Sequence, residues 1–322
     1  MYKTFMNLLL CTKTYWTRIV NLSYFLSDYK KCMKYSLGYP INTREKHTAQ
    51  IMLLMHSLEK GLSMPDKKQG FGKEKSLKLS QMISKYNQKY GRCETIDTAI
   101  NILDAYLKCE FSTQDTPTRN TISRLITENR SVLIEGRGGT RSIEKPSFDL
   151  SFMQILDFYS QRHSIRQYSR KPISPEEIKK AQMIAASTPT ACNRQTSRLY
   201  SFRDKETIYR LLDNQLGGQG WCENADTLFV ITSDQSYFNG NYERAQPYVD
   251  GGLFAMNFVM GLHAQKIASC FKMFIKSPKR EKKFKAIAGI SDTEIPIVLI
   301  LAGHYLDEPV LSPISHKQTQ QK

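Results

Sequence analysis

The sequence has no uninterrupted apolar run near the roughly 20 residues that a membrane-spanning helix needs. The nearest candidate, residues 5–11, is short and contains Asn7. It is followed by Lys13 and Arg18 instead of the small-residue cleavage site of a secretory signal. We therefore expect residues 5–11 to begin a soluble helix, and we expect no integral membrane segment.

Paired cysteine motifs are also missing. The 7 cysteines are odd in number and scattered, and they show neither C-x-x-C spacing nor histidine partners. This pattern argues against a disulfide framework and against a zinc site, so we expect no metal and a reducing, cytoplasmic location. With only 17 Gly and 12 Pro and no low-complexity tract, a mostly disordered or fibrous chain is also excluded.

The chain has 322 residues and a net charge of +16, with most of the positive excess before residue 150. This length favours two domains. An anionic partner would suit the charge, but scattered lysines more often form a solvated face. We expect no nucleic-acid partner.

The first half predicts an all-α domain, over residues 1–142. Three windows between 44 and 135 repeat apolar residues at helical spacing. The stripes comprise Ile51, Leu54, Met55, Leu58 and Leu62; Leu79, Met82, Ile83, Tyr86 and Tyr90; and Ile96, Ala99, Ile100, Leu103 and Leu107. Residues 135–147 gather Gly, Pro and mixed charge, which is typical of a linker.

The second half, 148–322, alternates helical and strand patterns and predicts an α/β or α+β domain. Ser174 and Glu177 form a capping box around Pro175, which predicts a helix to about residue 187. Residues 227–232 and 295–302 are short apolar runs, typical of strands buried on both faces. Residues 248–265 are apolar almost all round, so we expect a central buried helix there.

One candidate binding motif is the run Arg-His-Ser-Ile-Arg at 162–166. In an extended segment, side chains alternate, so Arg162, Ser164 and Arg166 would share one face. Two guanidinium groups and a hydroxyl suit a phosphate. By spacing alone, an ordinary surface segment is the more common outcome for such a pattern.

A second candidate is the run Thr-Pro-Thr-Ala-Cys-Asn-Arg-Gln at 188–195, which follows the capped helix. Its Pro and Asn favour a fixed turn. Asn193 and Gln195 each carry a donor and an acceptor that could bind the edge of a heterocycle. Taken alone, such a loop is more often a plain connection between a helix and a strand.

Together these motifs resemble the nitroreductase family of FMN-dependent oxidoreductases. The resemblance extends over most of 151–310, through S-P-E-E-I, the D-G-G-L-F-A-M-N helix, A-S-C-F-K-M and the final strand with G-H-Y-L-D-E-P. It implies an α+β fold, an α/β sandwich of nitroreductase type, preceded here by an all-α N-terminal domain. It also implies an FMN-binding domain over 148–322.

The resemblance implies roles for particular residues. The motif that holds the FMN phosphate in the family corresponds to Arg162, Ser164 and Arg166, with His163 inside it. The loop that reaches the flavin from the dimer partner corresponds to Pro189, Thr190, Ala191, Asn193 and Gln195. A backbone N–H in Ser269–Met273 would meet flavin N5, and Lys317 is the candidate for a further phosphate contact near the C-terminus. No catalytic acid or base is assigned, because the flavin carries the hydride chemistry.

The sequence departs from the family pattern after Gln195. The family usually has Pro-Trp there, whereas this chain has Thr196, Ser197 and Arg198, so the flavin could be packed differently. The stretch His-Ser-Leu-Glu-Lys-Gly-Leu at 56–62 resembles a larger subgroup with a helical N-terminal half, associated with surface-polysaccharide gene clusters.

The resemblance therefore implies a homodimeric FMN-dependent oxidoreductase. It would take electrons from NADH or NADPH and reduce a second small-molecule substrate, in a process linked to surface-polysaccharide biosynthesis. The alternative is a catalytically weakened flavoprotein or adaptor whose basic helical half binds an anionic partner. The missing Pro-Trp favours the adaptor, and the intact phosphate motif favours the enzyme.

Overall fold

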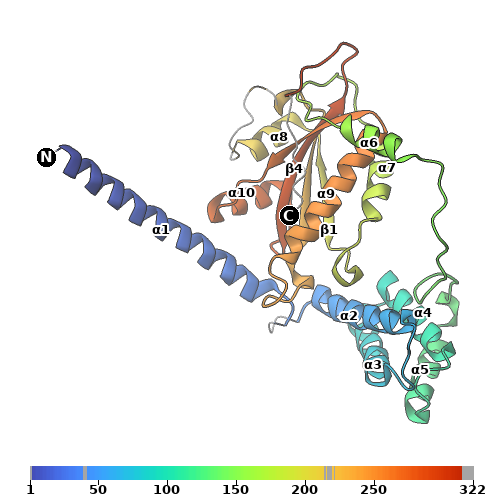
Figure 1. The fold of residues 1–322 in the computed structure, drawn as a ribbon. Helices are drawn as coiled ribbons and strands as arrows, with labels where there is room; N and C mark the ends of the chain where they lie inside the picture. The colour runs from blue at the N-terminus through green and yellow to red at the C-terminus, as the bar shows by residue number, and fades with distance from the viewer. Residues whose placement is uncertain (1, 39–41, 214, 216–219, 221, 314–322) are drawn as a thin grey trace. The chain divides into compact units, whose positions relative to one another are not determined.

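The computed structural model describes residues 2–38, 42–213, 215, 220 and 222–313, and within them the chain forms ten α-helices and four β-strands (Figure 1). The helices are α1 (Tyr2–Tyr35), α2 (Arg44–Ser63), α3 (Lys73–Tyr90), α4 (Glu94–Lys108), α5 (Thr116–Glu128), α6 (Phe152–Ser160), α7 (Pro175–Ala186), α8 (Lys205–Leu212), α9 (Gln246–Ala264) and α10 (Pro278–Ala288). The strands are β1 (Ser197–Phe202), β2 (Thr227–Asp234), β3 (Ile267–Met273) and β4 (Glu294–His304). In these described segments, no helix is both long enough and apolar enough to span a membrane.

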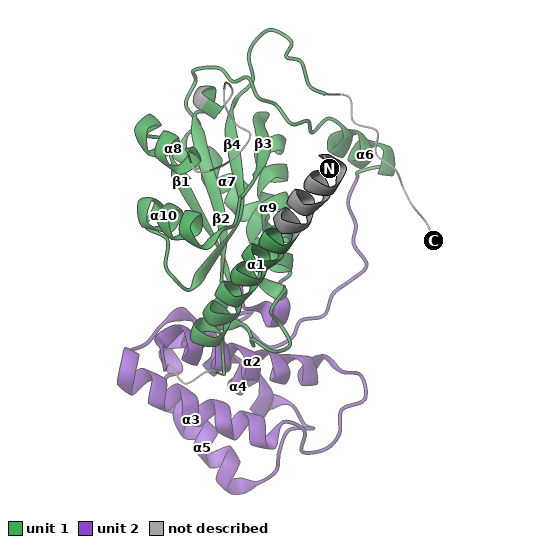
Figure 2. Ribbon diagram, turned by 90° about the vertical axis from the view of Figure 1, so that its left-hand side faces the viewer, with its two compact units in different colours: residues 1–39, 150–189, 196–322 green, residues 40–149, 190–195 purple. Residues whose placement is uncertain are grey.

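The chain divides into two compact units, shown in different colours in Figure 2. The sheet unit comprises residues 1–39, 150–189 and 196–322, and the helical unit comprises residues 40–149 and 190–195. The predicted domains, 1–142 and 148–322, were divided on the composition of the linker alone. The compact units differ from them in two segments, because α1 joins the sheet unit and the 190–195 loop joins the helical unit.

Contacts between α1 and the rest of the sheet unit explain the first difference. Lys31 forms an ion pair of 2.7 Å with Glu281 of α10. Just beyond α1, the backbone N–H of Leu37 donates to the carbonyl of Phe238 at 2.8 Å. These partners are far from α1 in the sequence, so the linker composition could not reveal them.

The sheet has the strand order β1-β2-β4-β3, and every neighbouring pair is antiparallel. All of β2 is buried, as its continuous apolar run predicts. One face packs residues such as Phe229 and Ile300 against α7 and α9. The other packs Leu228 and Leu299 together with residues of α8 and α10. With the separate helical unit, this arrangement confirms the predicted α+β class.

Local capping signals set the start of α7. The Ser174 side chain accepts from the Glu177 backbone, the Glu177 carboxylate accepts from the Ser174 backbone, and Pro175 is the first helical residue. The capping box predicted from the sequence is therefore confirmed. It fixes where α7 begins.

The expectation that residues 248–265 form a buried helix was only partly right. α9 is exposed along one side, at Tyr248, Val249, Leu253 and Met256, although its sequence is apolar all round. α6 has no buried residue although its sequence shows an apolar face. Hydrophobic periodicity identifies an apolar side, but what covers that side depends on tertiary or quaternary contacts.

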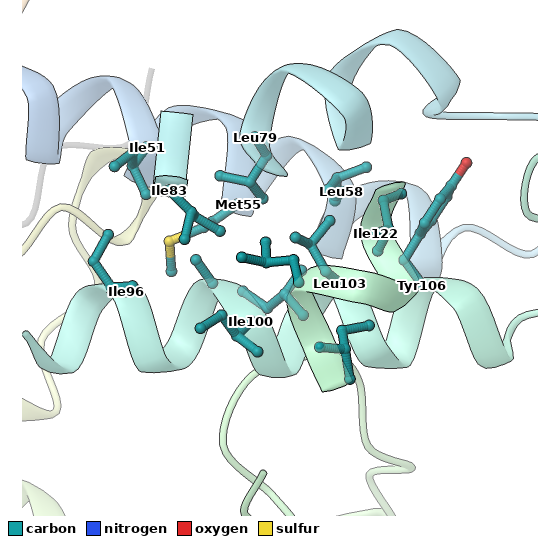
Figure 3. Packing of buried hydrophobic residues seen from close by; sticks show 14 of the residues in the cluster. Ile51, Met55, Leu58, Leu79, Ile83, Ile96, Ile100, Leu103, Tyr106 and Ile122 are labelled. Atoms are coloured by element: carbon teal, nitrogen blue, oxygen red, sulfur yellow. The ribbon is translucent and has the colours of Figure 1, made fainter. Parts of the chain in front are cut away.

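The helical unit has its own core between α2, α3, α4 and α5 (Figure 3). The three predicted stripes supply most of it, including Leu58, Ile83 and Leu103. Sequence reasoning did not delimit α5, whose start is capped by Asp115, with its carboxylate accepting from the Thr118 backbone. The predicted helices over the three stripes are confirmed.

Candidate functional site

The Arg162–Arg166 segment lies against the edge strand of the sheet. Ser164 forms an isolated parallel bridge with Ser269 of β3, and the Ile165 N–H donates to the Ser269 carbonyl at 3.1 Å. β3 is the last strand in the sheet order, so its outer edge is available for this pairing. The segment is otherwise irregular, with strand-like pairing only at this bridge among its described residues.

Two buried side chains fix this segment. Ile165 and Tyr168 both belong to the core on one face of the sheet. The Tyr168 hydroxyl donates to the Ile165 carbonyl at 2.6 Å, and burial raises the pKa of this phenol far above its ordinary value. The neighbouring Arg162, Ser164 and Arg166 are half-buried, as expected for side chains that alternate with a buried Ile165.

Cys270 of β3 follows Ser269 and lies beside the segment that carries the predicted phosphate trio, Arg162, Ser164 and Arg166. Burial raises the pKa of the Cys270 thiol, whereas the charge of Arg166, a hydrogen bond with Ser164 and the charge of Arg162 act in the opposite direction. The bridge from Ser164 to Ser269, the residue before Cys270, places the segment beside this thiol at the sheet edge.

Sequence reasoning missed two further residues near the trio. Lys272 is buried two positions after Cys270, on the same face of β3, and its charge also acts on the Cys270 thiol. Tyr305 follows β4; burial raises the pKa of its phenol, and Arg162 opposes this shift. Lys272 shares a face with Cys270 because residues i and i+2 of a strand do so, but which face is buried is known only from the register of β3.

This group of side chains suits an anion. Arg162, Arg166 and Lys272 provide positive charge, Ser164 adds a neutral donor, and two guanidinium groups can bind phosphate oxygens in pairs. His163 is exposed, whereas the residues on either side of it are half-buried. In the part of the chain that the structure describes, no group of three or more His, Cys, Asp or Glu side chains could hold a metal ion.

The 190–195 loop has an unusual backbone. Cys192, Asn193 and Gln195 have φ values of 52°, 51° and 50°, in the left-handed region that non-glycine residues rarely adopt. Such conformations cost on the order of 1–3 kcal/mol each and are concentrated at functional sites. The sequence could not reveal this geometry, because none of these residues is a glycine.

Hydrogen bonds within the loop hold this conformation. The Gln195 N–H donates to Thr190 Oγ1 at 3.0 Å, and Gln195 Nε2 donates to Asn193 Oδ1 at 3.0 Å. Arg194 is almost completely buried, and its Nε donates to the Ala191 carbonyl at 2.9 Å. Asn193 and Gln195 are exposed, so a fixed backbone presents a linked pair of amide side chains to solvent.

The loop packs on α2 within the helical unit. Burial lowers the pKa of His56 in α2, and the charges of Lys60 and Arg194 act in the same direction. Other members of the 56–62 stretch have packing roles: Leu58 is in the helical core, and a Cβ on Gly61 would lie 2.7 Å from the Phe71 ring. Part of this sequence pattern is therefore explained by packing.

Two predicted site residues remain, Pro189 just after the end of α7 and Lys317 near the C-terminus. Thr188 is buried, and its Oγ1 accepts from Asn257 Nδ2 of α9 at 2.7 Å, whereas the adjacent Pro189 is exposed. Lys317 lies outside the described residues. The trio and Pro189 belong to the sheet unit, and Thr190, Ala191, Asn193 and Gln195 belong to the helical unit.

Comparison with known proteins shows that a single family match covers both motifs. Residues 159–219 match the model of the nitroreductase family. A curated protein of Archaeoglobus fulgidus, provisionally named NADH dehydrogenase/NAD(P)H nitroreductase, is 25% identical over 155 residues, which cover 48% of this chain and 87% of that protein. The family match contains both the trio and the 188–195 loop, so the resemblance inferred from these motifs is confirmed.

The chain is also similar to solved structures. An FMN-dependent nitroreductase from Clostridium difficile is 19% identical, with a TM-score of 0.42, over 49% of this chain and 91% of that chain. A nitroreductase family protein from Streptococcus pneumoniae is 21% identical, with a TM-score of 0.44, over 51% of this chain and 96% of that chain.

Proposed function

We propose that this chain, whose segment 159–219 matches the nitroreductase family, is an FMN-dependent oxidoreductase that uses NADH or NADPH to reduce a small-molecule acceptor. The placement of Arg162, Ser164 and Arg166 carries the proposal: their segment pairs with β3 through the Ser164–Ser269 bridge, and all three side chains are half-buried there. This spacing of residues is common on exposed protein surfaces. Here the two arginines and the serine are instead half-buried at a sheet edge.

The residues present fit the cofactor. Arg162, Ser164 and Arg166 would hold the FMN phosphate, with Lys272 adding positive charge from β3. The exposed amides of Asn193 and Gln195, held in the fixed loop with Thr190 and Ala191, would bind the edge of a heterocycle. Bound FMN supplies the hydride-transfer chemistry, and the protein supplies binding and orientation.

We infer a homodimer that shares each flavin between two chains. The support is the exposed side of α9, where Val249, Leu253 and Met256 follow one another at helical spacing. α6 adds Phe152 and Met153, which are also exposed. Large apolar side chains gathered on a surface mark interaction sites, and a two-fold pairing would cover both copies equally. The Pro189–Gln195 loop would then reach the flavin of the partner chain.

The visible spectrum of the purified protein tests the function. We expect a yellow protein whose flavin absorption bleaches when NADH or NADPH is added without oxygen. The matched control is the Arg162→Ala/Arg166→Ala variant, which should be colourless and remain folded by circular dichroism.

Two other outcomes separate the alternatives. A yellow protein inert to both nicotinamides would favour a flavoprotein or adaptor without this turnover. A colourless wild type that cannot take up FMN would contradict the cofactor assignment. The cytoplasmic location and the link to surface-polysaccharide biosynthesis remain predictions from cysteine usage and from the 56–62 stretch.

A further inference from the structure

α1 carries a stripe of large apolar side chains that the described chain leaves exposed. The members of this α1 stripe, with their exposed fractions, are Tyr15 (66%), Ile19 (59%), Leu22 (59%), Leu26 (49%), Tyr29 (60%) and Met33 (37%). Successive members are alternately four and three residues apart. This is the spacing of the a and d positions of a coiled coil, in which each helix buries its seam against another helix.

α1 contacts the rest of its sheet unit through the face opposite the stripe. At about 100° per residue, the α1 stripe lies within about 40° of one line along the helix, and Asp28, Lys31 and Tyr35 lie roughly 140–160° away from that line. Within the sheet unit, Lys276 pairs with Asp28 at 2.9 Å, Lys31 with Glu281 at 2.7 Å, and the Tyr35 hydroxyl donates to Asp292 at 3.4 Å. The chain's own contacts therefore leave the stripe facing away from its sheet unit.

We propose that α1 pairs with α1 of a second copy of this chain in a two-stranded coiled coil. A heptad stripe is complementary to itself, so a two-fold pairing of identical helices buries both stripes with the same contacts. In this pairing Trp16 and Phe25, which are 68% and 73% exposed, flank the seam and cover its edges. The interface is separate from the residues assigned to the flavin and does not depend on them.

The area of the stripe is sufficient for such an interface. Complete burial of one side chain of this size removes roughly 60–120 Å² of apolar surface from water. Two copies of the stripe together would remove on the order of 1,000 Å², which is what a specific protein interface needs. A long helix without such packing gains little stability from propensity alone.

The spacing of the stripe, and not the charge of α1, favours a second copy over an anionic membrane surface. The stripe alternates strictly between four and three residues, as a coiled-coil seam does. A helix that lies on a membrane uses free basic residues on its polar face to attract lipid headgroups. Arg18, Lys30 and Lys34 are exposed basic residues elsewhere on α1, so the vesicle measurement below separates the two occupants.

Disulfide cross-linking of the full chain tests the pairing in either orientation. In a parallel coiled coil Leu26 faces Leu26 of the second copy, and in an antiparallel one centred on these residues Leu22 faces Leu26. The Leu22→Cys/Leu26→Cys variant should therefore form a covalent dimer on mild oxidation in both cases. The matched control, Val20→Cys/Tyr24→Cys, has the same spacing on the opposite face, and we expect roughly ten-fold less dimer from it.

A mass measurement gives an independent check. Leu22→Lys/Leu26→Lys should lower the number of associated copies in sedimentation, whereas Tyr24→Lys should not, with folding of both followed by circular dichroism. Equal cross-linking of the two cysteine pairs would overturn the proposal. It would also be overturned if the stripe cysteines did not cross-link and the wild type instead co-sedimented with phosphatidylserine vesicles.

Discussion

Lys31 in α1 and Glu281 in α10 are 250 positions apart in the sequence, and their side chains form an ion pair of 2.7 Å. The Glu281 side chain is only 2% exposed, and Lys285 lies 3.2 Å from its other oxygen. A buried carboxylate flanked by two ammonium groups is compensated, so breaking one side leaves a charge in a poorly solvated place. This pair links the last turns of α1 to α10 within the sheet unit.

Replacing Glu281 should therefore destabilise the sheet unit. We expect Glu281→Gln to lower the free energy of unfolding by about 3–5 kcal/mol, because Lys285 remains buried without its counter-charge. The control is Asp213→Asn, which breaks the more exposed Lys283–Asp213 pair of 3.7 Å and should cost less than about 1 kcal/mol. Urea denaturation measures both, and equal losses would contradict the role of burial.

The contribution of Glu281 should also depend on pH. Burial opposes ionisation of this carboxyl, but the hydrogen bond from Lys31 and the charge of Lys285 dominate and lower its pKa in the folded protein. A carboxyl whose folded pKa is depressed stabilises the fold above its unfolded pKa of about 4.3, and this contribution is lost as pH falls through the folded value. The difference in unfolding free energy between wild type and Glu281→Gln should be constant near neutral pH and shrink below about pH 4.

The crossing of α7 and α9 provides a packing test. A Cβ on Gly261 would lie 2.7 Å from the Ala181 Cα and 2.9 Å from its carbonyl oxygen, and this backbone cannot move cheaply. We expect Gly261→Ala to cost about 1–3 kcal/mol. At Gly252 on the same helix nothing lies within 4 Å, so Gly252→Ala should leave stability unchanged or raise it by up to about 1 kcal/mol. Thermal unfolding of the two variants decides whether close packing requires Gly261.

The proposed phosphate contact has its own test. Arg166→Ala should weaken FMN binding roughly 10- to 150-fold, because a charge-assisted hydrogen bond contributes roughly 1.5–3 kcal/mol. Arg170→Ala is the control, since Arg170 is an exposed arginine four residues away. Fluorescence titration gives both affinities. Equal affinities would show that Arg166 does not contact the phosphate.

Elements with local signals could be predicted from the sequence. The α7 capping box lies within four residues, and the stripe of α4 repeats within a single helix. The predicted strands at 227–232 and 295–302 became β2 and β4, because continuous apolar runs need burial on both faces. In each case the residues that carry the signal are close together in the sequence.

Features that depend on distant or non-standard geometry could not be predicted. The Lys31–Glu281 pair depends on tertiary contacts between segments at opposite ends of the sequence. The left-handed Cys192 and Gln195 carry no glycine signal, and the burial of Lys272 follows only once the register of β3 is known. The period of two placed Arg162, Ser164 and Arg166 on one face of an extended segment, whereas their phosphate role came from the family resemblance and stays a prediction. The position of this segment beside Cys270 required the fold.

Sharing of each site between two chains can be tested by mixing inactive variants. If the flavin takes Arg166 from one chain and Asn193 from its partner, Arg166→Ala and Asn193→Ala should each remove most activity. Refolded together, they should regain activity at one of the two sites of each heterodimer, because two-fold symmetry leaves one site with both wild-type residues. Activity should therefore reach about half the wild-type value per heterodimer. Heterodimers isolated with two different affinity tags but still inactive would show that Arg166 and Asn193 serve a site within one chain.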